Sequence, residues 1–126
     1  MNLLKYSLLI GYCAALVWLS LASSLPQTGL DWPHKDKLGH ALAYALMTLL
    51  AAWVWSRGAS LTLKGLVLGL LFAMVFGGVM EFLQGLVTPA RQAEWWDLFA
   101  NFSGGLIVFF GGLRWLVRRE KLNSRA

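Results

Sequence analysis

Four long apolar segments constrain the fold of this chain more than any other feature. A helix rises about 1.5 Å per residue, so about 20 apolar residues cross the hydrocarbon core of a bilayer. Residues 6–25, 38–55, 63–87 and 96–117 meet this length. Because the connections between them are short, we expect neighbouring helices to pack antiparallel. The sequence therefore predicts an all-α membrane protein, a four-transmembrane-helix bundle that forms a single domain over residues 1–126.

The composition excludes an ordinary soluble domain. Hydrophobic residues make up 58% of the chain and charged residues 13%, whereas soluble domains have about 45–50% and about 25%. The net charge of +5 does not indicate nucleic acid as a partner, because the basic residues cluster at the ends of apolar segments. Cys13 is the single cysteine, so no intrachain disulfide can form.

The first segment has a second interpretation. Lys5, the apolar run and the small residues of Ala22-Ser23-Ser24 also resemble a signal peptide. The apolar run is long for a signal peptide, so we expect the segment to be retained. Under either interpretation, the loop that follows lies outside the cell.

The basic residues predict the orientation, because cytoplasmic loops carry the excess of lysine and arginine. One side of a four-span arrangement holds Lys5, Arg57, Lys64, Arg114, Arg118, Arg119, Lys121 and Arg125. The other side holds Lys35, Lys37 and Arg91. We therefore expect both termini in the cytoplasm, a location in the inner (cytoplasmic) membrane, and loops 26–37 and 88–95 facing outward.

Polar residues are unexpectedly regular at the start of the second segment. Asp36, His40 and Tyr44 are spaced by four, which places them on one helix face. Simpler explanations exist for three residues here: Asp36 as an N-cap, Lys37 reaching to the interface, and Tyr44 as an interfacial aromatic. They do not account for His40, which lies about one turn inside the span.

The third segment carries an acid near its outer end. Glu81 and Gln84 share a face, and a charged carboxylate at this depth costs about 1–3 kcal/mol unless it is paired or wet. A buried ion pair that only fixes packing is the alternative. Small residues at intervals of four let helices approach closely and also allow oligomerisation. We expect such a ridge to bring Glu81 to the bundle interior; its members are Gly65, Gly69, Ala73 and Gly77.

The fourth segment opens with Asp97 and Asn101, spaced by four, and Gly104-Gly105 follow. Asp97 as an N-cap and Asn101 as a hydrogen bond between spans are the structural alternatives. The polar residues of all three segments fall within the outer third of the bundle, with Arg91 in the loop above. Together they predict one outward-opening polar pocket.

The order and spacing of these residues resemble the VanZ-like family of small multi-span bacterial membrane proteins. The resemblance covers Asp36-Lys37-x-x-His40-x-x-x-Tyr44, then Glu81-x-x-Gln84, then Arg91, Asp97, Asn101 and Gly104-Gly105. The family takes its name from a protein associated with resistance to the glycopeptide antibiotic teicoplanin. The resemblance implies a role in the bacterial envelope and no particular reaction.

Two functions follow as hypotheses. The first is an enzyme acting on a lipid-linked or cell-wall substrate, with His40, Glu81 and Asp97 as its catalytic residues. His40 and Glu81 would form an acid–base pair, held by Asp97 or Asn101. Its predicted substrate-binding residues are Asp36, Lys37, Tyr44, Gln84, Arg91 and Asn101. The second is a non-enzymatic protein that binds a lipid headgroup, an antibiotic or a partner protein. In both, Lys37 and Arg91 would hold an anionic group of a lipid or cell-wall precursor.

Other functions fit less well. A transporter needs a polar path, and the inner halves of the spans offer none. A bis-histidine haem needs two intramembrane histidines, and His34 lies in a loop. A divalent metal held by His40, Glu81 and Asp97 is chemically reasonable. Because the spacing does not demand a metal, the sequence predicts no cofactor.

Overall fold

The chain folds into helices along the lengths that the apolar segments predict. The computed structural model describes residues 2–22, 34–58, 60–87 and 95–125. Within these residues there are four helices and no strand: α1 (Asn2–Leu21), α2 (Lys35–Trp55), α3 (Leu63–Val87) and α4 (Trp95–Asn123). All four are long and apolar enough to cross a membrane. The all-helical fold class is therefore confirmed.

The helix bounds differ from the predicted ones mainly where polar residues extend a helix. α3 has the predicted bounds, whereas α2 begins at Lys35, before the apolar run. α4 continues through the basic tail to Asn123, because lysine and arginine are good helix formers. Residues 23–25, at the end of the first predicted span, lie outside the described residues.

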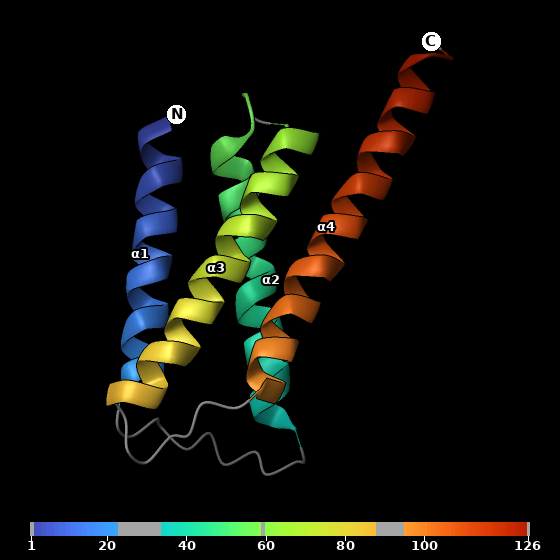
Figure 1. Cartoon of the computed structure of the whole chain (residues 1–126). Coiled ribbons are helices and arrows are strands. Elements are labelled where there is room, and N and C mark those ends of the chain that lie inside the picture. The colour runs from blue at the N-terminus through green and yellow to red at the C-terminus, as the bar shows by residue number, and fades with distance from the viewer. Residues whose placement is uncertain (1, 23–33, 59, 88–94, 126) are drawn as a thin grey trace.

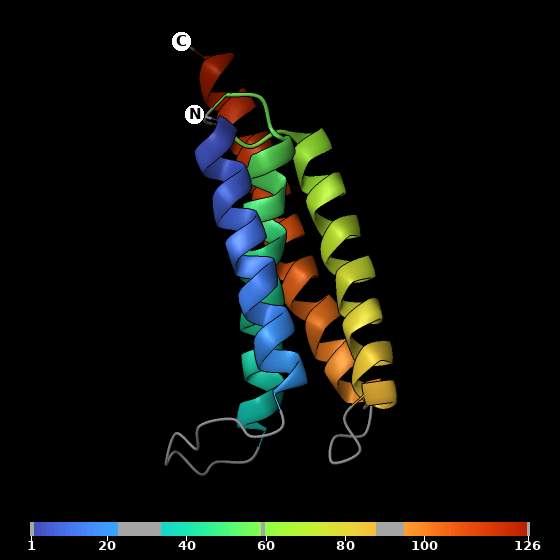
Figure 2. The ribbon, with the colours of Figure 1, turned by 90° about the vertical axis from the view of Figure 1, so that its left-hand side faces the viewer.

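The helices lie side by side, with α1 and α4 flanking the pair formed by α2 and α3 (Figures 1 and 2). Both chain termini lie at the same end of the bundle, and the C-terminal part of α4 extends beyond the other helices there (Figure 1). We call this the terminal end. The opposite end, where α2 and α4 begin, is called the polar end.

α2 is the central helix, since each of the other three helices makes its most extensive contact with it. Helices consecutive in the chain run antiparallel, as predicted. α2 and α4, however, run parallel and are in extensive contact. Gly104 makes this approach possible, because a Cβ at Gly104 would overlap the backbone carbonyl of Ala41.

The predicted ridge of small residues packs as a helix contact. Gly65, Gly69, Ala73 and Gly77 are all buried. A Cβ at Gly69 would lie 2.5 Å from the backbone nitrogen of Ala52, so α3 packs directly on the backbone of α2. Further along, Gly77 faces Tyr44 of α2 and Asn101 of α4. The ridge thus leads into the polar end, where Glu81 is buried as expected.

Candidate functional site

The first turns of α2 and α4 bring the acidic residues of the polar end into the bundle. His34 is the N-cap of α2, in a left-handed conformation with φ of 69°. Asp36 therefore lies inside the first turn and is not the N-cap. Asp97 likewise lies inside the first turn of α4, which begins at Trp95. Both N-cap interpretations are wrong, and both carboxylates are available for contacts with the neighbouring helix.

An ion pair joins the two parallel helices. The Lys37 ammonium contacts Asp97 Oδ1, and it also lies 4.0 Å from Asp36 Oδ2. The Asp97 side chain is 11% exposed and that of Lys37 28%. Carboxylates of the protein thus already surround Lys37. Its predicted role in holding an anionic ligand stays a prediction.

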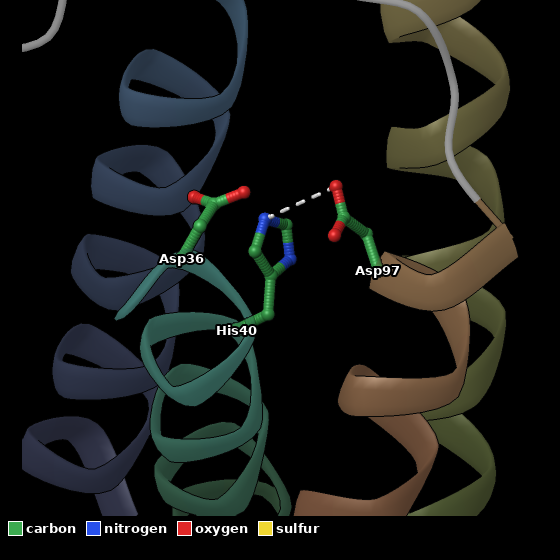
Figure 3. Close-up of side chains that lie close together, drawn as sticks. All are labelled: Asp36, His40 and Asp97. Carbon is green, nitrogen blue, oxygen red and sulfur yellow. Dashed lines mark ion pairs between the residues drawn. The ribbon is translucent and has the colours of Figure 1, made fainter. Parts of the chain in front are cut away.

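The imidazole ring of His40 lies between α2 and α4, and a hydrogen bond holds one of its two nitrogens. An amide oxygen only accepts, so His40 Nδ1 donates to Asn101 Oδ1, at 3.0 Å. This hydrogen bond directs Nε2 toward the carboxylates, 3.8 Å from Asp97 Oδ2. In Figure 3 the imidazole ring stands between the carboxylates of Asp36 and Asp97.

Of the other predicted site residues that the structure describes, Tyr44 and Gln84 line the cavity toward α1 and α3, and Glu81 is buried in α3. Gln84 Nε2 donates to the backbone oxygen of Ser20 at 2.9 Å. Tyr44 and Glu81 are both buried and are close enough to interact electrostatically. The hydrogen bond and the close carboxylate of His40 both come from α4, so the structure does not pair His40 with Glu81.

Two hollows flank α2 at the polar end, where the sequence predicted one pocket. A cavity of about 230 Å³ lies among α1, α2 and α3, and its polar lining comes from Ser20, Asp36, His40, Tyr44 and Gln84. A second hollow of about 700 Å³ lies between α2 and α4. It is lined by His34, Lys37, Leu38, Trp96, Phe99, Ala100 and Ser103. Both hollows are largely apolar, and the polar residues around His40 lie between them.

Some site residues were not predicted and one cannot be placed. Arg91 lies outside the described residues. Ser20, His34 and Ser103 line the hollows without having been predicted. The depth of Ser20 along its span could have identified it as a site residue, since it lies near the end of the first span at the level of Gln84. No spacing rule identifies His34 or Ser103.

The candidate metal ligands also differ from the predicted set. Asp36, His40 and Asp97 bring ligand atoms within 4.8 Å of one another, whereas Glu81 does not belong to this group. Comparison of the chain with family models, with curated proteins and with solved structures gives no match. We therefore infer the function from the geometry of the site.

Proposed function

We propose that this chain is a multi-pass protein of a bacterial cytoplasmic membrane that binds the headgroup of a lipid-linked envelope molecule at its polar end. The observation that carries the proposal is the position of Lys37. It forms an ion pair with Asp97 and also lines the apolar hollow between α2 and α4. A ligand with a polar head and an apolar chain fits such a junction.

The hollow has the size and lining that a lipid chain requires. Its volume of about 700 Å³ falls within the usual range of about 300–1,000 Å³ for ligand sites. Trp96 and Phe99 line it and remain 70% and 64% exposed. Apolar chain segments would cover these rings, while the headgroup would meet the polar side chains of α2 and α4.

The sequence resemblance supports an envelope role. The VanZ-like spacing includes Asp36, His40, Asp97 and Asn101, and these residues lie together at the polar end. Tolerance of a glycopeptide antibiotic would follow if the bound molecule is a lipid-linked cell-wall precursor. Glycopeptide susceptibility of a bacterium that expresses the chain, compared with one expressing Asp97→Asn, tests this part of the proposal.

The orientation is also part of the proposal, because an envelope ligand requires the polar end to face outward. The distribution of basic residues supports cytoplasmic termini. A reporter fused after Ala126 should report the cytoplasm, and one inserted near Gly29 should report the outside. A C-terminus found outside would contradict the orientation and the choice of ligand.

Filling the apolar hollow tests the binding proposal without changing a charged residue. Ser103 lines the hollow, so Ser103→Phe should lower the binding of a polyprenyl phosphate to the purified chain by at least about tenfold, about 1.4 kcal/mol. Leu106→Phe adds a ring to the same helix away from the hollow and is the matched control. Equal binding by both variants and the wild type would contradict the proposal.

Catalysis at the same site is the second candidate function. It is favoured by the fixed orientation of His40, which Asn101 holds opposite Asp97. Positioned acid–base groups contribute about 100- to 10,000-fold to a rate. If the bound lipid is converted, His40→Gln should lose that conversion even at lipid concentrations that saturate the variant, as measured by mass spectrometry of the lipid. Glu81→Gln applies the same test to the other predicted acid.

A further inference from the structure

Three side chains with metal-ligating atoms come together at the polar end. Asp36 and His40 of α2 and Asp97 of α4 each offer one atom, and these atoms lie within 4.8 Å of one another. We propose that they bind one divalent cation of the Zn²⁺ or Mn²⁺ type, and that this cation binds the phosphate of a lipid headgroup. The second part rests on the proposed function, and the first part does not.

The spacing between His40 and Asp97 suits a shared cation better than a direct hydrogen bond. Their facing atoms, Nε2 and Oδ2, are 3.8 Å apart, whereas N–H···O hydrogen bonds measure about 2.7–3.2 Å. Zinc binds nitrogen and oxygen at about 2.0–2.2 Å, so two ligands of one tetrahedral ion lie about 3.4 Å apart, close to the spacing seen here. A side-chain adjustment of Asp36, which is 58% exposed, would bring the third ligand into range.

The hydrogen bond of His40 selects the ring nitrogen that faces the carboxylates. Because Nδ1–H donates to Asn101, the neutral ring presents the lone pair of Nε2 toward Asp36 and Asp97. Three electron-pair donors then face one another, an arrangement that a cation bound between them would stabilise. Metal-ligating histidines commonly donate their other N–H to a fixed oxygen in this way.

Lys37 completes the surroundings of the site. It contacts Oδ1 of Asp97, while His40 faces Oδ2, so the two oxygens of one carboxylate have different partners. Two carboxylates and one ammonium leave the cluster with a net negative charge. The cluster alone therefore repels a phosphate, and a divalent cation would reverse the local charge.

The site lies between the apolar hollow proposed for the lipid chain and the cavity of about 230 Å³. Lys37 lines the hollow and contacts Asp97, while Asp36 and His40 line the cavity. A headgroup bound beside Lys37 could therefore reach a cation at this site. Three protein ligands leave at least one coordination position vacant on a tetrahedral ion. A phosphate oxygen is suited to that position, because hard oxygen ligands bind divalent cations readily.

Direct metal titration tests the first part. The full chain, purified in detergent and stripped with a chelator, should bind about one Zn²⁺ per chain, and Mn²⁺ should compete. Asp36→Asn and His40→Gln should each weaken Zn²⁺ binding by at least about 100-fold, since loss of an outer partner alone costs about 10–100-fold. Glu81→Gln removes a buried carboxylate that the site does not use and should leave Zn²⁺ binding unchanged.

Two results would overturn the metal site. One is no Zn²⁺ binding above the level of His40→Gln. The other is wild-type affinity in Asp36→Asn combined with loss in Glu81→Gln, which would point to a different ligand set.

Lipid binding tests the second part and separates it from the proposed function. A polyprenyl phosphate should bind the Zn²⁺-loaded chain at least about tenfold more tightly than the stripped chain. Equal binding in both forms would overturn the metal's role and leave the proposed function standing. Zn²⁺ binding without lipid binding in either form would contradict the proposed function and support the metal site alone.

Discussion

The two ends of the bundle use buried polar residues in different ways. At the terminal end, Lys5 is 3% exposed and donates to the backbone oxygens of Trp53 and Gly58, at 2.9 and 2.6 Å. Its ammonium also lies over the Trp53 ring. Ser56 Oγ bonds the Ala52 carbonyl and accepts from the backbone of Thr62. These contacts satisfy the backbone where α2 ends and α3 begins.

At the polar end, the side chains interact with one another instead. Lys37 pairs with Asp97, and His40 bonds Asn101, so side chains of α2 and α4 bond one another there, while Gln84 of α3 donates to the Ser20 backbone. Hydrogen bonding to the backbone accounts for these contacts at the terminal end, because buried backbone groups need partners. It does not explain why a histidine and two carboxylates face each other beside a cavity. The difference favours a structural role for one end and a ligand site for the other.

The largest expected effect on stability comes from separating α2 and α4. Gly104→Ala places a Cβ on the carbonyl of Ala41, and we expect it to lower the unfolding free energy by about 3 kcal/mol, the upper end of typical overpacking costs. Because the polar end needs both helices, Zn²⁺ binding should be lost as well. Gly111→Ala, where a Cβ meets open space, is the control. Unfolding in mixed detergent micelles measures the change.

A smaller effect is expected at the terminal end. Lys5→Met removes two charge-assisted hydrogen bonds and should lower the unfolding free energy by about 1.5–3 kcal/mol. Zn²⁺ and lipid binding by the folded protein should remain at the wild-type level. A loss of binding as large as that in His40→Gln would show that the two ends are not independent.

The smallest effect on stability is expected at Asn101. Its Nδ2 is buried and has no hydrogen-bond partner among the residues that the structure describes, so Asn101→Leu should change stability by less than about 1.5 kcal/mol. Zn²⁺ affinity should fall by about 10–100-fold, because the ring of His40 loses its fixed orientation. Ser103→Ala on the same helix should leave Zn²⁺ affinity unchanged. A stability loss without a change in Zn²⁺ affinity would contradict the positioning role.

The sequence predicted the helices, and the depth of their polar residues in the bundle, well. Both depend on the fixed rise per residue of a helix. α3 has the predicted bounds, and Asp36, His40, Asp97 and Asn101 lie at one end of the bundle. The ridge from Gly65 to Gly77 also packs as predicted.

Contacts between helices could not be predicted in the same way. The expected acid–base partner of His40 was Glu81, with Asp97 or Asn101 holding the pair. The structure brings Asn101 and Asp97 to His40, but its acidic neighbour is Asp97 rather than Glu81. Helical spacing gives the face of a residue on its own helix and not the helix that this face meets. The parallel contact of α2 and α4 decides the pairing, and it depends on how Gly104 fits against Ala41. The ion pair of Lys37 could not be predicted from spacing either, because the contact between α2 and α4 decides that Asp97 is its partner.

The unfolding free energy of the double variant Lys37→Met/Asp97→Leu tests most directly whether the polar end is a ligand site. Replacing a buried ion pair by apolar side chains of similar volume is often neutral or stabilising by about 1–4 kcal/mol. If the cluster exists for a ligand, the double variant should be as stable as the wild type, or more stable. If the ion pair instead holds α2 and α4 together, the unfolding free energy should fall by several kcal/mol, and that result would contradict the account.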